Sequence, residues 1–210
     1  MPDSFPSMPP VAPPAAQLGD QIQIRHFTPR HTTPLPNLAG QTLTVTHASP
    51  GLLSVDDAGG RTYFLDAPLS KPLEVVYGVT VLHPWRLLAS HFGDVLRLDV
   101  LGAATLLCVS EDGAGGAFVP VGHLDADGAA TITAQFDGAV EQALRVAAFG
   151  MGWEWAVCSG GLLPVRATVR VTHPAGDEQV VPGHAQQGSL ALARAMRLAL
   201  EVTGQGGEAS

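Results

Sequence analysis

Charged residues, and lysine above all, are scarce in this sequence. Only 14% of its 210 residues are charged, and Lys71 is the single lysine beside ten arginines. The formal net charge is −8. Neutralising a phosphate backbone and releasing its counterions requires clustered cations. The balance of charge therefore argues against broad nonspecific binding of nucleic acid by the chain as a whole.

Cysteine is also rare, and its placement is uninformative for chemistry. Cys108 and Cys158 each lie inside an apolar run, and neither belongs to a CxxC motif or to a paired spacing. We therefore predict that both are small, reduced residues of the core, as is usual in the cytoplasm.

Long apolar segments are absent as well. No stretch of about 18 uncharged apolar residues occurs, which is the length that a membrane-spanning helix requires. The opening residues "MPDSFPSMPPVAPPAAQ" contain neither a basic region nor a continuous apolar run. We therefore expect no secretion, no membrane partner and a cytoplasmic location.

Enzyme signatures are missing too. The sequence contains no GxSxG, no HExxH and no Walker glycine-lysine loop. Its nearest approach to a nucleotide loop is "GMGWEW" (150–155), but there a predicted helix precedes and a predicted strand follows, whereas the dinucleotide fingerprint requires strand, turn and helix. We expect no enzymatic activity and no cofactor.

Enough apolar material is present for a folded core, since 46% of the residues are hydrophobic. We predict an α+β protein whose first two thirds are rich in β-structure and whose last third is an α-β-β-α module. A proline-rich arm (1–18) and a glycine-rich tail (204–210) are expected to be disordered.

Residues 19–70 are predicted to form a small barrel. Apolar and polar residues alternate in "GDQIQI" and in "QTLTV", which indicates half-buried strands, and "DDAGG" has the composition of a turn. The succession of "GDQIQI", "LAGQTLTV" and "GGRTYFL" resembles SH3-like barrels. Such a resemblance implies a fold and no catalytic residue.

Residues 71–136 are predicted to form an antiparallel meander with one short helix. A buried strand (73–82) is followed by a helix in "HPWRLLASHF", with Pro84 in its first turn. Four further strands then follow at hairpin spacing, and "EDGAGG" and "DADG" are turns between them.

Residues 137–203 have the pattern of two helices around strands. Val140, Ala143, Leu144 and Ala147 recur at helical spacing after Asp137, which is expected to cap the helix. "WEWAV" and "VRATVRV" alternate as strands. A closing helix, "SLALARAMRLALEV", is expected to be capped near Ser189, with Arg194, Arg197 and Glu201 on its polar stripe.

A helix that ends in "GMGWEW", strands with "HPAGDEQVVP" and a helix opened by Ser189 resemble the phage-type ABA sandwich domains. Gly152-Trp153, "THPAGDE" and "GHA" (183–185) are also similar to the deinococcal DdrB family of DNA-damage-response proteins. The second resemblance implies binding of single-stranded DNA in a stress or phage-related setting. Each resemblance covers about a third of the chain.

Eight histidines raise the question of a metal site. His123, Asp125 and Asp127 alternate in "HLDAD", and Asp-x-Asp-Gly also occurs in calcium loops. A tight hairpin turn at "DADG" explains the same residues, and the other calcium ligands are missing. His83 and His91 lie eight positions apart, which is too far for one ion without a third element. We predict a turn, surface or capping histidines, and no metal.

One candidate for nucleic-acid contact is "RHFTPRH" (25–31). It places Arg25 and Arg30 beside Phe27, a mixture that suits phosphate contact and base stacking. A solvated strand end whose phenylalanine packs inward is the alternative, and it requires no ligand.

The second candidate lies in the last module. Arg166 and Arg170 share one face of a predicted strand, where they would meet either a nucleic acid or the acidic segment 73–139. Trp153 and Trp155 would supply stacking. The alternative is that "GMGWEW" is a junction between a helix and a strand, with at least one tryptophan in the core.

These patterns favour a non-catalytic binding protein. The first hypothesis is binding of single-stranded DNA through Arg25, Arg30, Trp153, Trp155, Arg166 and Arg170. The alternative is a protein-protein interaction or self-association module, which the proline-rich arm, the acidic β portion and the many short strand edges favour.

Overall fold

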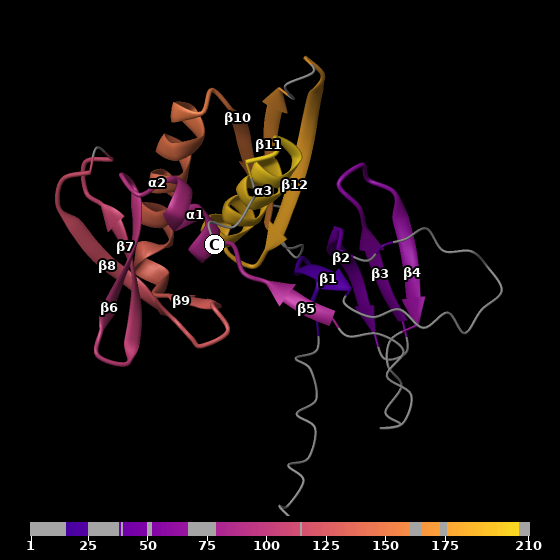
Figure 1. Cartoon of the computed structure of the whole chain (residues 1–210), viewed down its shortest axis with the longest axis horizontal. Helices are drawn as coiled ribbons and strands as arrows, with labels where there is room; N and C mark the ends of the chain where they lie inside the picture. The colour runs from indigo at the N-terminus through magenta and orange to yellow at the C-terminus, as the bar shows by residue number, and fades with distance from the viewer. Residues whose placement is uncertain are drawn as a thin grey trace, which may run out of the picture.

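The structure is a computed structural model, and it describes residues 16–24, 38, 40–49, 52–66, 79–113, 115–159, 165–172 and 176–205. The described chain is an α+β protein that contains three antiparallel sheets and three α-helices (Figure 1). Disorder was expected for residues 1–18 and 204–210; of these, residues 1–15 and 206–210 lie outside the described residues, and so do Arg25 and Arg30. None of the described helices is long and apolar enough to cross a membrane.

The first sheet, which is called the barrel below after its predicted form, has the strand order β4-β3-β2-β1-β5. In the described chain β4 and β5 are its edge strands, and the resemblance to SH3-like barrels stays a prediction. Its strands are β1 (Gln21–Ile24), β2 (Thr42–Ser49), β3 (Leu52–Asp56), β4 (Thr62–Asp66) and β5 (Val79–Leu82). The alternating residues Ile22, Leu43 and Val45 form its own small core. Ile22 lies opposite both Leu43 and Val81. The strand expected in the meander therefore completes this sheet.

The second sheet follows the sequence order β6-β7-β8-β9 and is preceded by a short helix. Its elements are α1 (Trp85–His91), β6 (Leu96–Leu101), β7 (Ala104–Ser110), β8 (Phe118–Leu124) and β9 (Ala130–Ile132). Helix α1 begins directly after Pro84, where a missing backbone donor is harmless, as predicted. Trp85 is buried beneath the sheet in the main core.

The last third is an α-β-β-β-α module and has one strand more than expected. It comprises α2 (Asp137–Gly150), β10 (Glu154–Cys158), β11 (Val165–Thr172), β12 (Glu178–Ala185) and α3 (Gly188–Val202). The sequence pattern of β12 is interrupted by Pro182 and Gly183. Proline is tolerated because β12 is an edge strand, where its missing N–H costs no ladder bond. A Cβ at Gly183 would lie 2.1 Å from the Ala191 carbonyl oxygen, so only glycine lets α3 approach.

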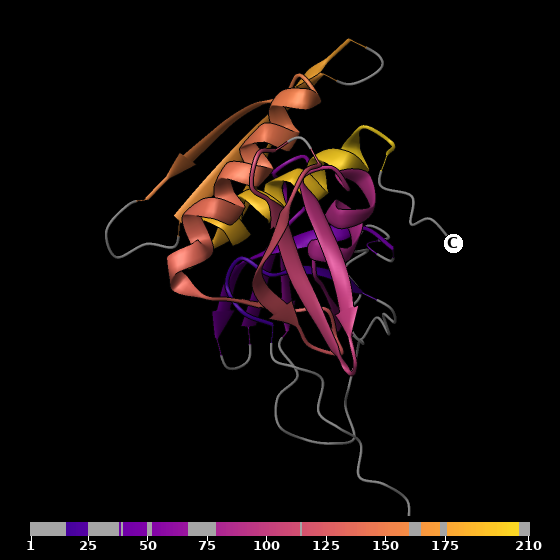
Figure 2. The same ribbon diagram turned by 90° about the vertical axis from the view of Figure 1, so that its left-hand side faces the viewer.

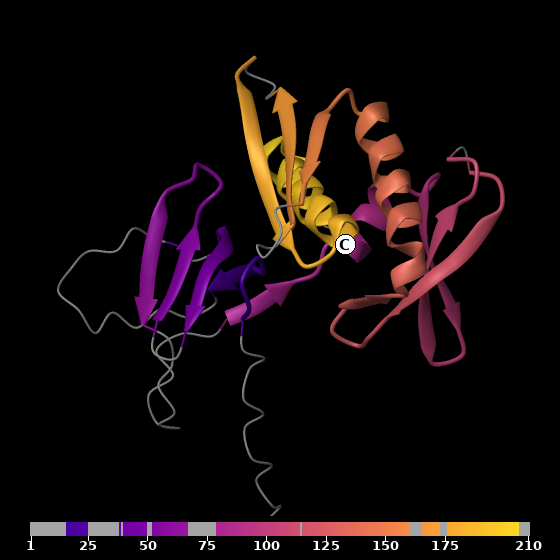
Figure 3. The ribbon, with the colours of Figure 1, turned by 180° about the vertical axis from the view of Figure 1, so that it is seen from behind.

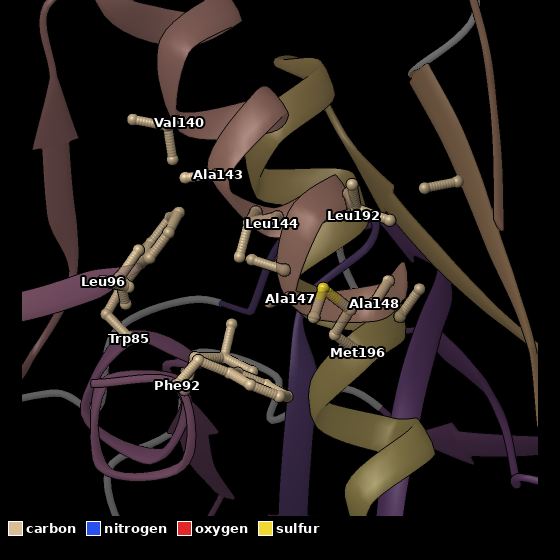
Figure 4. Packing of buried hydrophobic residues seen from close by; sticks show 14 of the residues in the cluster. Trp85, Phe92, Leu96, Val140, Ala143, Leu144, Ala147, Ala148, Leu192 and Met196 are labelled. Carbon is tan, nitrogen blue, oxygen red and sulfur yellow. The ribbon is translucent and has the colours of Figure 1, made fainter. Parts of the chain in front are cut away.

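Helices α2 and α3 cover one face of this third sheet (Figure 2), and the second sheet packs on the far side of α2 (Figure 3). Buried residues of all these elements belong to one hydrophobic core. Figure 4 shows residues from β6, the α1 segment, α2 and α3 in this core: Trp85, Phe92, Leu96, Leu144, Ala147, Leu192 and Met196.

The two expected helix caps have a different role. Helix α2 begins at Asp137 itself, so its N-cap residue is Phe136, and the N-cap residue of α3 is Gln187. Neither of these N-cap side chains makes a capping hydrogen bond. Instead, the Ser189 hydroxyl donates a hydrogen bond to the Asp137 carboxylate. Polar side chains at these two helix starts therefore join α2 to α3, since the helices begin side by side.

Candidate binding groove

Trp153 lies in the core at the junction between α2 and β10. Its side chain is 8% exposed, and its ring packs edge-on against Phe92, with ring centroids 6.3 Å apart. The Trp153 backbone N–H donates to the Ala148 carbonyl oxygen at 2.9 Å. Gly152 has a φ of 71°, which explains the glycine at this turn.

Trp155 is half-buried on the helix-covered face of the third sheet. The Arg145 guanidinium of α2 lies 4.3 Å from the centre of its ring, in a cation–π arrangement, and Arg145 also pairs with Glu141. One face of the Trp155 ring is therefore covered by the protein itself.

Arg166 and Arg170 lie on the opposite, open face of the third sheet, as their alternation along β11 predicts. Arg170 Nη1 is 3.5 Å from Glu154 Oε2 and 3.7 Å from Glu178 Oε2. Arg166 is exposed, and its cross-strand neighbours are Cys158 and His184. The two arginines thus share a face, whereas the two tryptophans are directed away from it.

The "HLDAD" segment forms the predicted hairpin turn. The Asp125 carboxylate accepts a hydrogen bond from Ala129 N–H at 2.9 Å, and the backbones of these residues also pair. His123 is exposed on β8. Within the described ranges, no group of three or more histidines, cysteines or acids is arranged to hold a metal ion.

The remaining sequence candidates lie apart from one another. His91 is exposed at the end of α1, where its ring contacts the Leu87 and Gln205 carbonyl oxygens at 3.0 and 2.6 Å. His83 is half-buried, and burial lowers its pKa. Cys108 is buried as predicted, but the prediction for Cys158 is wrong: it is exposed, because it falls on the open face of β10.

A groove of about 980 Å³ separates the barrel from the third sheet. Figures 1 and 3 both place the barrel beside β12. One wall comes from β2 and from the turn between β3 and β4, and the other comes from β12. Arg166 of β11 and Leu198 of α3 also line the groove. The lining residues are Thr44, Thr46, Asp56, Asp57, Ala58, Gly59, Gly60, Arg166, Asp177, Glu178, Gln179, Val180, Pro182, His184 and Leu198.

The lining of the groove is acidic. Asp56, Asp57, Asp177 and Glu178 contribute carboxylates, and Arg166 is the one arginine among the described lining residues. Burial, together with the nearby Arg166 and Arg194, lowers the pKa of His184. His184 is therefore neutral at pH 7 and does not offset the carboxylates.

The two neighbouring aspartates of the barrel wall differ in how their oxygens are used. Asp57 accepts hydrogen bonds from the Gly59 and Arg61 backbone N–H groups and from the Tyr63 hydroxyl, each at 2.9 Å. Burial acts to raise the pKa of Asp57, but these hydrogen bonds outweigh it and lower the pKa. Asp56 Oδ1, by contrast, is buried and has no hydrogen-bond partner among the described residues.

A buried polar clamp holds the two walls together. Arg194 of α3 pairs with Asp20 at 2.5 Å and donates to the His184 carbonyl oxygen at 2.6 Å. Gln21 Nε2 donates to the Arg194 carbonyl oxygen at 2.7 Å. A Cβ at Gly19 would lie 2.4 Å from the His184 oxygen, so the chain approaches too closely for any other residue.

A second attachment lies at the other end of the barrel. Gln179 Nε2 donates to the Ala58 carbonyl oxygen at 2.8 Å, and the Ala58 side chain packs against the main core. The barrel therefore contacts the module on both sides of the groove.

Comparison of the chain with protein-family models and with curated proteins yields no match.

Sequence reasoning missed both the groove and the clamp. Arg194 was expected on an exposed polar stripe of α3 with Arg197 and Glu201, but only 7% of it is exposed. Arg197 and Glu201 do pair with each other, at 2.8 Å. The available signal was that Arg194 lies within a run of alanines and leucines, where a solvent-facing position is unusual.

Proposed function

We propose that this protein is a non-catalytic protein-interaction module and that a segment of a partner polypeptide occupies the groove between the barrel and β12. The observation that carries the proposal is the groove itself, whose walls come from two separately packed units. The Arg194 clamp joins these units, so the site is formed before a partner arrives. Preorganisation of this kind lowers the entropy lost on binding.

The dimensions and lining of the groove suit a peptide. Its volume of about 980 Å³ is at the upper end of ligand pockets, which measure about 300–1,000 Å³. Val180 and Pro182 supply apolar contact, and Val180 is 50% exposed. Apolar contacts flanked by charged residues are the composition of a polypeptide interface.

Binding of single-stranded nucleic acid is the alternative, and the site favours it less. A sequence-tolerant site for single strands combines free aromatic faces with unpaired cations in one channel. Here Trp153 is buried, Trp155 is covered by Arg145, and Arg170 has two carboxylate neighbours. The groove beside Arg166 carries negative charge, which repels phosphates.

The proposal is tested by selecting a displayed library of random twelve-residue peptides on the full-length protein. We expect peptides whose binding is abolished by Thr46→Trp, which fills the groove from β2. The matched control is Thr131→Trp on the exposed side of β9, and it should leave binding unchanged.

A parallel titration with a fluorescein-labelled 30-mer of oligothymidine at low salt addresses the alternative. Tight binding that Arg166→Ala weakens and that added salt reverses, together with no groove-dependent peptide, would overturn the proposal in favour of nucleic acid.

A further inference from the structure

We infer that the partner segment is basic and that one of its arginine or lysine side chains pairs with Asp56 in the groove. This inference rests on the proposed function, because it names the chemistry of the segment that the groove receives. It depends on three features of the site: an unused carboxylate oxygen, an excess of negative charge and an edge strand that is poorly suited to strand addition.

The first feature is Asp56 itself. It ends β3, lies opposite Thr44 and Thr62 in the barrel sheet and lines the groove. A buried carboxylate oxygen without a donor is destabilising, because it has lost its hydration and gained no hydrogen bond. Asp57 next to it has three protein donors, so the difference is specific to Asp56. Oδ1 is closed to solvent in the unbound protein, but Asp56 as a whole is only half-buried and lines the groove, so a cation there approaches its carboxylate from the groove side.

The second feature is the charge of the walls. Asp177 and Glu178 of the β12 wall face the same groove as Asp56 and Asp57, and Arg166 is the one described lining residue with a permanent positive charge. Glu178 also lies 3.7 Å from Arg170, which offsets part of its charge, but the four acids still outnumber these two arginines. His184 is uncharged at neutral pH. A guanidinium or ammonium group is therefore attracted and an acidic segment is repelled, which selects the partner by charge.

The third feature concerns how the segment is held. β12 is the edge of the third sheet, but Pro182 offers no N–H, the His184 carbonyl oxygen is used by Arg194, and Gln179 bridges to the barrel. Addition of a continuous strand to this edge is therefore disfavoured. Recognition through side chains remains, with the cation on Asp56 and an apolar neighbour on Val180.

The experiment uses the same peptide selection on the full-length protein. We expect the groove-dependent peptides to be enriched in arginine and lysine. For the tightest of them, Asp56→Asn should raise the Kd at least tenfold. Asp127→Asn removes the same charge from an exposed turn of the second sheet and should leave the Kd unchanged. The melting temperature of D56N should not fall, because Asp56 Oδ1 has no hydrogen-bond partner among the residues that the structure describes.

A second variant tests the inference without touching Asp56. Arg166 is exposed and lines the groove, and Arg166→Glu replaces its positive charge with a negative one. Because this change makes the groove more acidic, it should lower the Kd for the basic peptide severalfold. Groove-dependent peptides that are acidic or uncharged would overturn the inference and leave the proposed function standing. Basic peptides that bind D56N and R166E as they bind the unaltered protein would overturn it as well. A selection that yields no groove-dependent peptide would overturn both.

Discussion

Asp20 and Arg194 form an ion pair of 2.5 Å between the first strand region of the barrel and the middle of the last helix, 174 positions apart in the sequence. Both side chains are largely buried. The pair connects the two walls of the groove, because Arg194 also binds the His184 carbonyl oxygen of β12. The geometry of the candidate site therefore depends on this contact.

Replacing Arg194 should be costly. Arg194→Met leaves Asp20 as an unpaired buried charge, and we expect the free energy of unfolding in urea to fall by about 3–5 kcal/mol. Arg97→Met breaks the exposed Arg97–Asp99 pair and is the matched control, with little expected change. A change in R194M as small as that of the control would show that the clamp does not hold the barrel in place.

Gly183 should not tolerate a side chain. A Cβ there would lie 2.1 Å from the Ala191 oxygen and 2.5 Å from the Ala195 nitrogen, both backbone atoms of α3. We expect Gly183→Ala to lower the free energy of unfolding by about 1–3 kcal/mol. Gly138→Ala in α2 meets open space and should instead raise it by about 0.5–1 kcal/mol. Equal effects of the two changes in thermal melts would contradict this packing.

The fluorescence of the three tryptophans should be dominated by one accessible ring. Trp85 and Trp153 are buried and Trp155 is half-buried, so Trp155→Phe should remove most of the fluorescence that acrylamide quenches. Arg145→Ala uncovers the ring of Trp155 and should increase quenching. Arg61→Ala, on an exposed barrel turn, is the control. Quenching that persists in W155F would place another tryptophan at the surface.

His184 should make stability and peptide affinity depend on pH. Burial, with Arg166 and Arg194, lowers its pKa below the usual 6.5, so the unfolded chain takes up the proton first. The contribution of His184 to stability is complete above about pH 6.5 and is lost as the pH falls through the folded pKa. His184→Gln should reduce this acid destabilisation in melts recorded between pH 7.5 and pH 5. In the same pH range, protonation of His184 should weaken the binding of a basic peptide. If the stability and the affinity of H184Q depend on pH as they do in the unaltered protein, His184 is not the group that titrates.

Much of the secondary structure could be predicted because it depends on local periodicity. The alternation in "VRATVRV" correctly placed Ala167, Val169 and Val171 in the core and Arg166 and Arg170 outside. The hairpin at Asp125 was predictable from turn chemistry. β12 was underestimated because Pro182 and Gly183 break the pattern, and both are explained only by their position at a sheet edge and beneath α3.

The candidate site was less predictable. Trp155 and Arg170 were both identified as candidate residues, but their partners Arg145, Glu154 and Glu178 determine whether they are available. Those partners come from a helix and from neighbouring strands whose register the sequence alone does not specify. Asp56 and Asp57 were identified only as part of a turn, and their different hydrogen bonding depends on the folded turn and on the wall opposite.

By itself the sequence determined the α+β class, the order of most elements and the face on which each alternating residue lies. These properties follow from hydrophobic periodicity and from the local chemistry of glycine, proline and aspartate, and each extends over only a few residues. The tertiary structure alone decided that Arg194 is buried against Asp20, that β5 pairs with β1 at the edge of the first sheet and that an acidic groove opens beside β12. Each of these depends on residues far apart in the chain, whose meeting is set by how the two cores pack.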